Sequence, residues 1–143
     1  MTRTIHFSEE DGIEFYYDIR DHIWIYIRLM MAYVNKGTEE KSDIYKKSRN
    51  FIFDTGAQNT IISRRRAMEF KYTSLPIMDR VSAGGIGGGV LYCSRIEIPE
   101  MAITDNLIIR RPSVLIPEDP NINVNILGQD ILRPYSYYLD AKK

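Results

Sequence analysis

The sequence has few of the residues from which disulfides and metal sites are built. Its 143 residues include one cysteine, Cys93, so no disulfide can form within the chain, which fits a reducing compartment. The two histidines, His6 and His22, belong to no Cys/His cluster of the kind that binds zinc. We therefore expect no metal site and no cofactor.

The chain also carries no net charge. The 19 basic residues balance 19 acidic ones, so the formal net charge is zero. A protein without a positive excess has no general electrostatic attraction for nucleic acid, and we expect no such partner. Apolar residues make up 44% and charged residues 27% of the chain, as in an ordinary globular domain.

Long hydrophobic runs are the third absence. The most apolar stretch, residues 23–34, is short and is interrupted by Arg28, so it cannot span a bilayer. Residues 1–11 contain no apolar segment of signal-peptide length. These features predict a cytoplasmic protein that does not engage membranes.

Short strands separated by turn signals dominate what is present. Aromatic and β-branched residues in a period of two predict a long strand over residues 23–34, with an amphipathic helix as the weaker alternative. The polar residues 35–50 predict a surface connection that can include a short strand near Ile44-Tyr45. A helical turn capped by Ser63 is expected to run through Phe70. The pattern indicates a compact all-β domain with one or two short helices. Further expected strands cover residues 13–19, 77–82, 90–98, 103–109, 114–116, 124–128 and 135–139, and a second helical turn covers 129–132.

One stretch places an acid directly behind an apolar strand. Phe51, Ile52 and Phe53 predict a buried strand that runs into Asp54-Thr55-Gly56-Ala57. A buried carboxylate is costly unless it is hydrogen-bonded or shares a proton, and a glycine allows the tight turn that such a placement needs. These residues alone leave two interpretations open, an ordinary Asx-turn or a site of chemistry.

A glycine-rich segment, residues 83–89, lies between two predicted strands and indicates the tip of a hairpin. A tip without side-chain bulk can approach the backbone of a ligand closely, although it can equally be a plain hairpin end. A phosphate-binding loop is excluded because a strand follows the glycines in place of a helix with lysine and Ser/Thr.

Three segments, taken in order, resemble the retropepsin-like aspartic proteases. Asp54-Thr55-Gly56-Ala57 with Thr60-Ile61-Ile62-Ser63 is similar to their active-site turn, and Ala83-Gly84-Gly85-Ile86-Gly87-Gly88 is similar to the flap tip of the retroviral members. Residues 123–132 resemble their second apolar-apolar-glycine strand and the short helix after it. The resemblance covers roughly Trp24 to Asp140 and suggests a protease domain at residues 23–143, preceded by an extension, 1–22, of unknown role.

The resemblance implies a small closed β-barrel, one lobe per chain, that acts as a homodimeric aspartic endopeptidase. Each chain would supply one catalytic aspartate, Asp54, and the two carboxylates would share a proton and activate a water molecule. Thr55 would brace the pair across the two-fold axis, and Gly56 would leave room for the substrate backbone.

The same resemblance implies a set of residues that contact a peptide substrate. Gly84, Gly85 and Ile86 would close over an extended peptide, and Val124 and Ile126 would line side-chain pockets that favour apolar residues. Plain core packing is the alternative for Val124 and Ile126. The full predicted substrate-binding set is Ala57, Gly84, Gly85, Ile86, Val124 and Ile126.

The chain departs from the family pattern at two positions. Retroviral members carry an acid two residues after the turn glycine and an arginine after the second glycine, where this chain has Gln58 and Gln129. We expect an amide–amide hydrogen bond or separate backbone contacts in place of the ion pair, with a weaker dimer or one held by other surfaces. Asp130 is expected to have a structural role in the short helix.

Two other hypotheses remain. A catalytically weak or inactive dimerisation or peptide-binding module would explain the lost charge pair. Residues 5–19 could also form an inhibitory or self-cleaved segment, which their position alone suggests.

Overall fold

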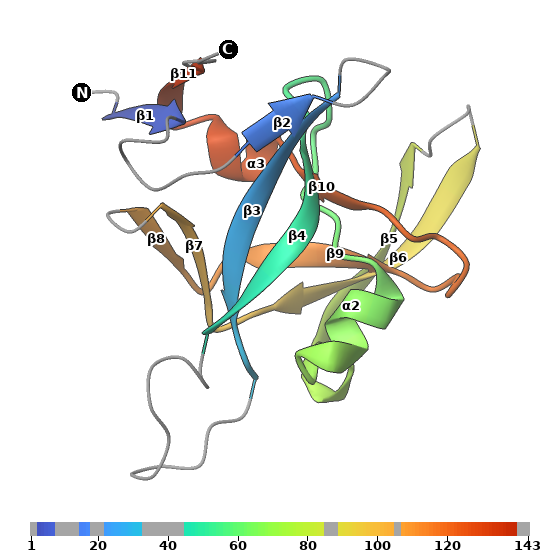
Figure 1. Cartoon of the computed structure of the whole chain (residues 1–143). Helices are drawn as coiled ribbons and strands as arrows, with labels where there is room; N and C mark the ends of the chain where they lie inside the picture. The colour runs from blue at the N-terminus through green and yellow to red at the C-terminus, as the bar shows by residue number, and fades with distance from the viewer. Residues whose placement is uncertain are drawn as a thin grey trace, which may run out of the picture.

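The computed structural model describes residues 3–7, 15–17, 22–32, 45–84, 89–104 and 107–139. Strands make up most of these residues, with two short α-helices and one 3-10 turn, which confirms the predicted all-β class (Figure 1). The elements are β1 (Arg3–Phe7), β2 (Phe15–Tyr17), β3 (Ile23–Met30), β4 (Tyr45–Phe53), α2 (Arg64–Glu69), η2 (Tyr72–Ser74), β5 (Ile77–Gly84), β6 (Val90–Glu97), β7 (Glu100–Thr104), β8 (Leu107–Arg110), β9 (Ser113–Pro117), β10 (Asn125–Leu127), α3 (Gln129–Leu132) and β11 (Tyr135–Leu139).

The strands form three groups. The largest has the order β10-β4-β3-β7-β8, with β2 also paired to β3. The second has the order β5-β6-β9, and β1 pairs with β11 in the third. Ile61 connects the first two groups, because it forms one bridge with Leu115 of β9 and another with Ile126 of β10. In Figure 1 the long β3 and β4 cross the middle of the molecule, while β5 and β6 project away from it.

The pairing of β4 with β10 is parallel and decides where the site lies. Phe51 is opposite Asn125, Ile52 opposite Ile126, and Phe53 opposite Leu127. Parallel partners end at the same edge of a sheet, so the segments after Phe53 and after Leu127 emerge side by side. The Asp54 N–H continues the ladder by donating to the Leu127 carbonyl oxygen at 3.1 Å.

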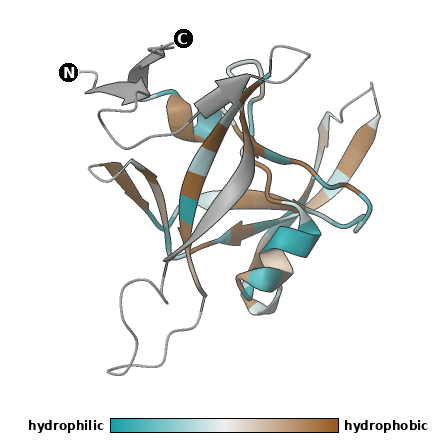
Figure 2. Cartoon of the chain, viewed as in Figure 1, coloured by the Kyte–Doolittle hydropathy of each residue, from teal (hydrophilic) through white to brown (hydrophobic). Residues whose placement is uncertain are grey.

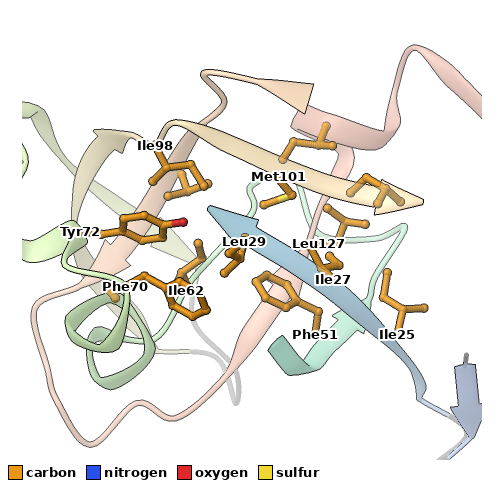
Figure 3. Packing of buried hydrophobic residues seen from close by; sticks show 14 of the residues in the cluster. Ile25, Ile27, Leu29, Phe51, Ile62, Phe70, Tyr72, Ile98, Met101 and Leu127 are labelled. Atoms are coloured by element: carbon orange, nitrogen blue, oxygen red, sulfur yellow. The ribbon is translucent and has the colours of Figure 1, made fainter. Parts of the chain in front are cut away.

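The main core is formed by the large sheet together with residues of β6, β9, α3 and the α2 region (Figure 3). Alternate residues of β3, namely Ile25, Ile27 and Leu29, are fully buried, as their period of two predicts. Tyr72 is also fully buried, and its hydroxyl donates to the Met30 carbonyl oxygen at 2.6 Å. This burial raises the pKa of the Tyr72 phenol.

The helix α2 begins as the sequence predicts. Ser63 is its N-cap, and the Ser63 hydroxyl oxygen accepts the Arg66 N–H at 3.2 Å. Ala67 is the buried residue of this helix, whose other turns are largely hydrophilic in Figure 2. The Ser63 N–H is bound by the side-chain oxygen of Asn125 at 2.9 Å, which connects the start of α2 to β10.

Two expectations about strands were wrong. A short strand was expected only near Ile44-Tyr45, but all of residues 45–50 belong to β4 and not to a surface connection, since they pair with β3 as far as Met30. Strand pairing here overrides the polar composition that favoured a loop. Residues 103–109 do not form one strand but contribute to the antiparallel pair β7 and β8. The turn-forming residue types Asp105 and Asn106, between the two strands, were the signal that the longer prediction overlooked.

No helix in the described ranges is both long and apolar enough to cross a membrane.

Candidate active site

Asp54 directly follows β4, and the turn after it forms a hydrogen bond with its carboxylate. Its Oδ1 accepts the Gly56 N–H at 2.9 Å, and its carbonyl oxygen accepts the Ala57 N–H at 3.3 Å. This is the Asx-turn geometry of the simpler interpretation. The side chain of Asp54 is not only a turn former, however, because it also lines a cleft.

The cleft has a volume of about 370 Å³, which lies within the range of small-ligand sites. Three separate segments form it: the turn after β4, the β5–β6 strand pair, and the segment entering β10. Asp54 is the one carboxylate among the described residues that line it. These residues are Asp54, Gly56, Ala57, Gln58, Asn59, Ile61, Ala83, Gly84, Leu91, Ile122, Val124 and Ile126.

A second apolar cluster, separate from the main core, forms the inner wall of this cleft. Its buried members are Ile61, Cys93, Leu115 and Ile126. Partly buried residues from β5, β6 and the segment before β10 pack against it, so the wall exposes apolar surface next to Asp54. Burial raises the pKa of the Cys93 thiol, and the nearby Glu118 charge adds to this shift.

Most of the predicted site residues come together around this cleft. Asp54, Gly56, Ala57, Gly84, Val124 and Ile126 all line it. Thr55 is exposed at the turn, and Gly85 and Ile86 lie outside the described residues. Ile126 is 5% exposed; it packs in the second cluster and also lines the cleft.

The predicted site set did not include four apolar residues of the cleft, Ile61, Ala83, Leu91 and Ile122. A usable signal existed for Leu91. In β6, Leu91 and Cys93 pack in the second cluster, whereas the intervening Tyr92 is 67% exposed. This alternation assigns Leu91 to the cleft side of the strand, on the same face as Cys93.

The start of α3 packs against the turn after β4 and supports it. A Cβ at Gly128 would lie 2.5 Å from the Asn59 carbonyl oxygen, so only glycine allows this approach. The Gln129 N–H donates to the Ala57 carbonyl oxygen at 2.8 Å, and the Gln129 Nε2 donates to the Thr55 carbonyl oxygen at 2.8 Å. We expected either an amide–amide hydrogen bond between the two glutamines or separate backbone contacts. For Gln129 the structure shows backbone contacts.

Asp130 has the structural role that the sequence suggested. Its Oδ1 accepts the Thr60 hydroxyl at 2.6 Å, and its Oδ2 accepts the Thr60 N–H at 3.0 Å. The Thr60 Oγ1 in turn accepts the Gly128 N–H at 3.0 Å. Thr60 is fully buried, so these bonds satisfy polar groups that water does not reach.

The fold is thus all-β, and a half-buried aspartate that directly follows a strand lines a partly apolar cleft, as expected of an aspartic protease-like protein. A sequence profile of the gag-polyprotein putative aspartyl protease family matches residues 41–134, and the chain belongs to this family.

A structural comparison agrees on the fold. The protein is similar to a retropepsin-like aspartic protease from Rickettsia conorii, with a TM-score of 0.55 and 15% sequence identity. The similarity covers 87% of this chain and 89% of the other. No curated protein sequence matches the chain significantly.

Proposed function

We propose that the protein is an aspartic endopeptidase that acts as a homodimer, in which each chain contributes Asp54. The observation that carries the proposal is the placement of Asp54 at the end of β4, on the edge of a cleft of about 370 Å³ with apolar walls. Membership of an aspartyl protease family supports the same chemistry.

The need for a second chain follows from the chemistry. Hydrolysis of a peptide bond by paired carboxylates requires one to take a proton from water and the other to donate a proton. Asp54 is the one carboxylate among the described residues of the cleft. The nearby Asp130 carboxylate is engaged by Thr60 and by the Ile131 N–H, so it serves the scaffold.

In the proposed mechanism the two Asp54 carboxylates share one proton and hold a water molecule between them. The ionised carboxylate removes a proton as the water attacks the peptide carbonyl carbon, and the protonated one donates to the carbonyl oxygen. Thr55 braces the pair across the two-fold axis. Gly56 lacks a side chain, which leaves space for the substrate backbone.

The proposed substrate is an extended peptide with apolar side chains beside the cleaved bond. Val124 and Ile126 bring apolar surface to the cleft, and Ala57 and Gly84 border it without bulky groups. Gly85 and Ile86 are proposed to cover the bound peptide. The proposed protease domain comprises residues 23–143, and no role is assigned to the 1–22 extension.

The test compares Asp54→Asn with Asp119→Asn. Both acids accept an N–H from the residue two positions on, Gly56 and Asn121 respectively, at 2.9 Å, but only Asp54 lines the cleft. A peptide library is incubated with each variant between acidic and neutral pH, with and without pepstatin. We expect cleavage by the wild type and by Asp119→Asn, inhibition by pepstatin, and no cleavage by Asp54→Asn.

Cleavage that survives in Asp54→Asn would refute the proposal. The alternative function, a non-catalytic peptide-binding or dimerisation module, is motivated by Gln58 and Gln129 in place of the family's charged pair. A wild-type protein that cleaves no peptide and sediments only as a monomer would favour that module.

A further inference from the structure

One peptide group in the catalytic turn is held at both ends. The Thr55–Gly56 peptide accepts a hydrogen bond at its carbonyl oxygen from Gln129 Nε2, at 2.8 Å. Its N–H, which belongs to Gly56, donates to Asp54 Oδ1 at 2.9 Å. We infer that Gln129 is a positioning residue that sets the orientation of the Asp54 carboxylate through this peptide. The inference rests on the proposed function.

The physical link is the rigidity of the peptide group. The carbonyl and the N–H of one peptide lie in a common plane, so a donor that fixes the oxygen also fixes the direction of the N–H. A hydrogen bond to the carbonyl oxygen also polarises the peptide and strengthens the N–H as a donor. Gln129 therefore both aims and strengthens the hydrogen bond that Asp54 receives from Gly56.

The backbone places Gln129 for this contact independently of its side chain. The close approach of Gly128 to Asn59 brings the start of α3 against the turn, and the Gln129 N–H is bound to the Ala57 carbonyl oxygen. The Asp130 N–H is bound to the Gln58 carbonyl oxygen at 3.0 Å. A change confined to the Gln129 side chain keeps all of these anchors, so we expect such variants to fold.

Water can replace the Gln129 amide at the exposed Thr55 carbonyl oxygen, but it does not fix the peptide plane. The expected consequence is a less well-oriented carboxylate and a cleft whose walls are unchanged. We therefore expect Gln129→Met, which keeps the length of the side chain but has no N–H donor, to lower kcat about tenfold with KM unchanged. Gln129→Arg restores a donor and should recover most of kcat.

The chain contains a single Thr-Gly dipeptide, Thr55-Gly56, which permits a direct measurement. Labelling with carbonyl-¹³C threonine and ¹⁵N glycine leaves one cross-peak in a spectrum that correlates each amide with the preceding carbonyl. Its carbonyl shift reports on the Gln129 contact, and its amide proton shift reports on the Asp54 contact. In Gln129→Met both shifts should move upfield, and Gln129→Arg should return them toward the wild-type values.

Arg133→Met is the matched control, because Arg133 follows α3, is exposed and does not line the cleft. It should leave the cross-peak and kcat unchanged. A cross-peak that stays in place in Gln129→Met overturns the inference, whatever the activity. A cross-peak that moves while kcat is unchanged overturns the positioning role. If the wild type cleaves nothing, the proposed function fails and the positioning role fails with it, but a moving cross-peak still establishes the contact.

Discussion

Two turns at the same edge of the sheet differ in what they contact. The turn after β4 consists of Asp54, Thr55 and Gly56, and the turn after β10 consists of Gly128 and the first two residues of α3, Gln129 and Asp130. Each follows an apolar strand, and each contains one glycine and one aspartate. The first lines the cleft, whereas the second packs against the backbone of residues 57–60.

The hydrogen bonds of the two aspartates show how the turns differ. The described partners of the Asp54 carboxylate are limited to the Gly56 N–H, which leaves lone pairs for a water or a substrate. The Asp130 carboxylate accepts three bonds, two from Thr60 and one from the Ile131 N–H. Each aspartate lies two positions from a glycine, but only Asp54 has a carboxylate that is left incompletely satisfied, as its proposed role requires.

The two glycines give the sharpest contrast, and Gly128→Ala should have the largest effect on stability. The new methyl group would lie 2.5 Å from the Asn59 carbonyl oxygen and 3.0 Å from that of Ala57, and both are backbone atoms that cannot turn away. We expect a loss of about 3 kcal/mol in the free energy of unfolding, measured by urea denaturation. A loss below about 1 kcal/mol would show that the second turn is not a rigid support.

Substitutions of Thr60 test whether hydrogen bonds, and not packing alone, make the second turn a rigid support. Thr60→Val removes the hydroxyl that donates to Asp130 and accepts the Gly128 N–H, so the exposed Asp130 carboxylate and the buried Gly128 N–H each lose a bond. We expect the free energy of unfolding to fall by about 2 kcal/mol in Thr60→Val. Thr60→Ser keeps the hydroxyl and should lose less than half as much. Equal losses in the two variants would assign the effect to packing.

Gly56→Ala should have a smaller effect on stability and a larger one on activity. Its Cβ would lie 3.3 Å from Asp54 Oδ1, which is a side-chain atom that can rotate to relieve the contact. We expect a stability loss of about 1 kcal/mol, together with a fall in cleavage greater than that of Gly128→Ala compared at equal folded fraction. The opposite ranking of the two glycine variants in activity would reverse the assignment of the turns.

Of these perturbations, alkaline pH should have the smallest effect on the free energy of unfolding. It acts through Cys93, which belongs to neither turn. Burial raises the pKa of the Cys93 thiol above its ordinary value of 9.0, so the folded state holds this proton more tightly than the unfolded state. That contribution to stability is complete at neutral pH and declines as the pH rises past 9.0. Urea denaturation of wild type and Cys93→Ala between pH 7 and pH 10 should show a shallower decline in the variant, and parallel curves would contradict this prediction.

The sequence predicted the parts of the fold that depend on local pattern. The period of two in β3 and the Ser63 cap needed no tertiary information. The family was predicted from three motifs in order, at residues 54–63, 83–88 and 123–132. The first half of β4 was missed because pairing with β3, and not composition, makes residues 45–50 a strand. The Thr60–Asp130 contact joins residues 70 positions apart and has no local signal.

Mixing wild-type chains with Asp54→Asn chains tests the central claim that each chain holds half of an active site. The two proteins are combined in equal amounts and left to exchange subunits, and cleavage is compared with that of the same total amount of wild type. If a dimer needs both aspartates, only wild-type pairs cleave, and activity should fall to about one quarter. A fall to about one half, the value for chains that act independently, would contradict the claim.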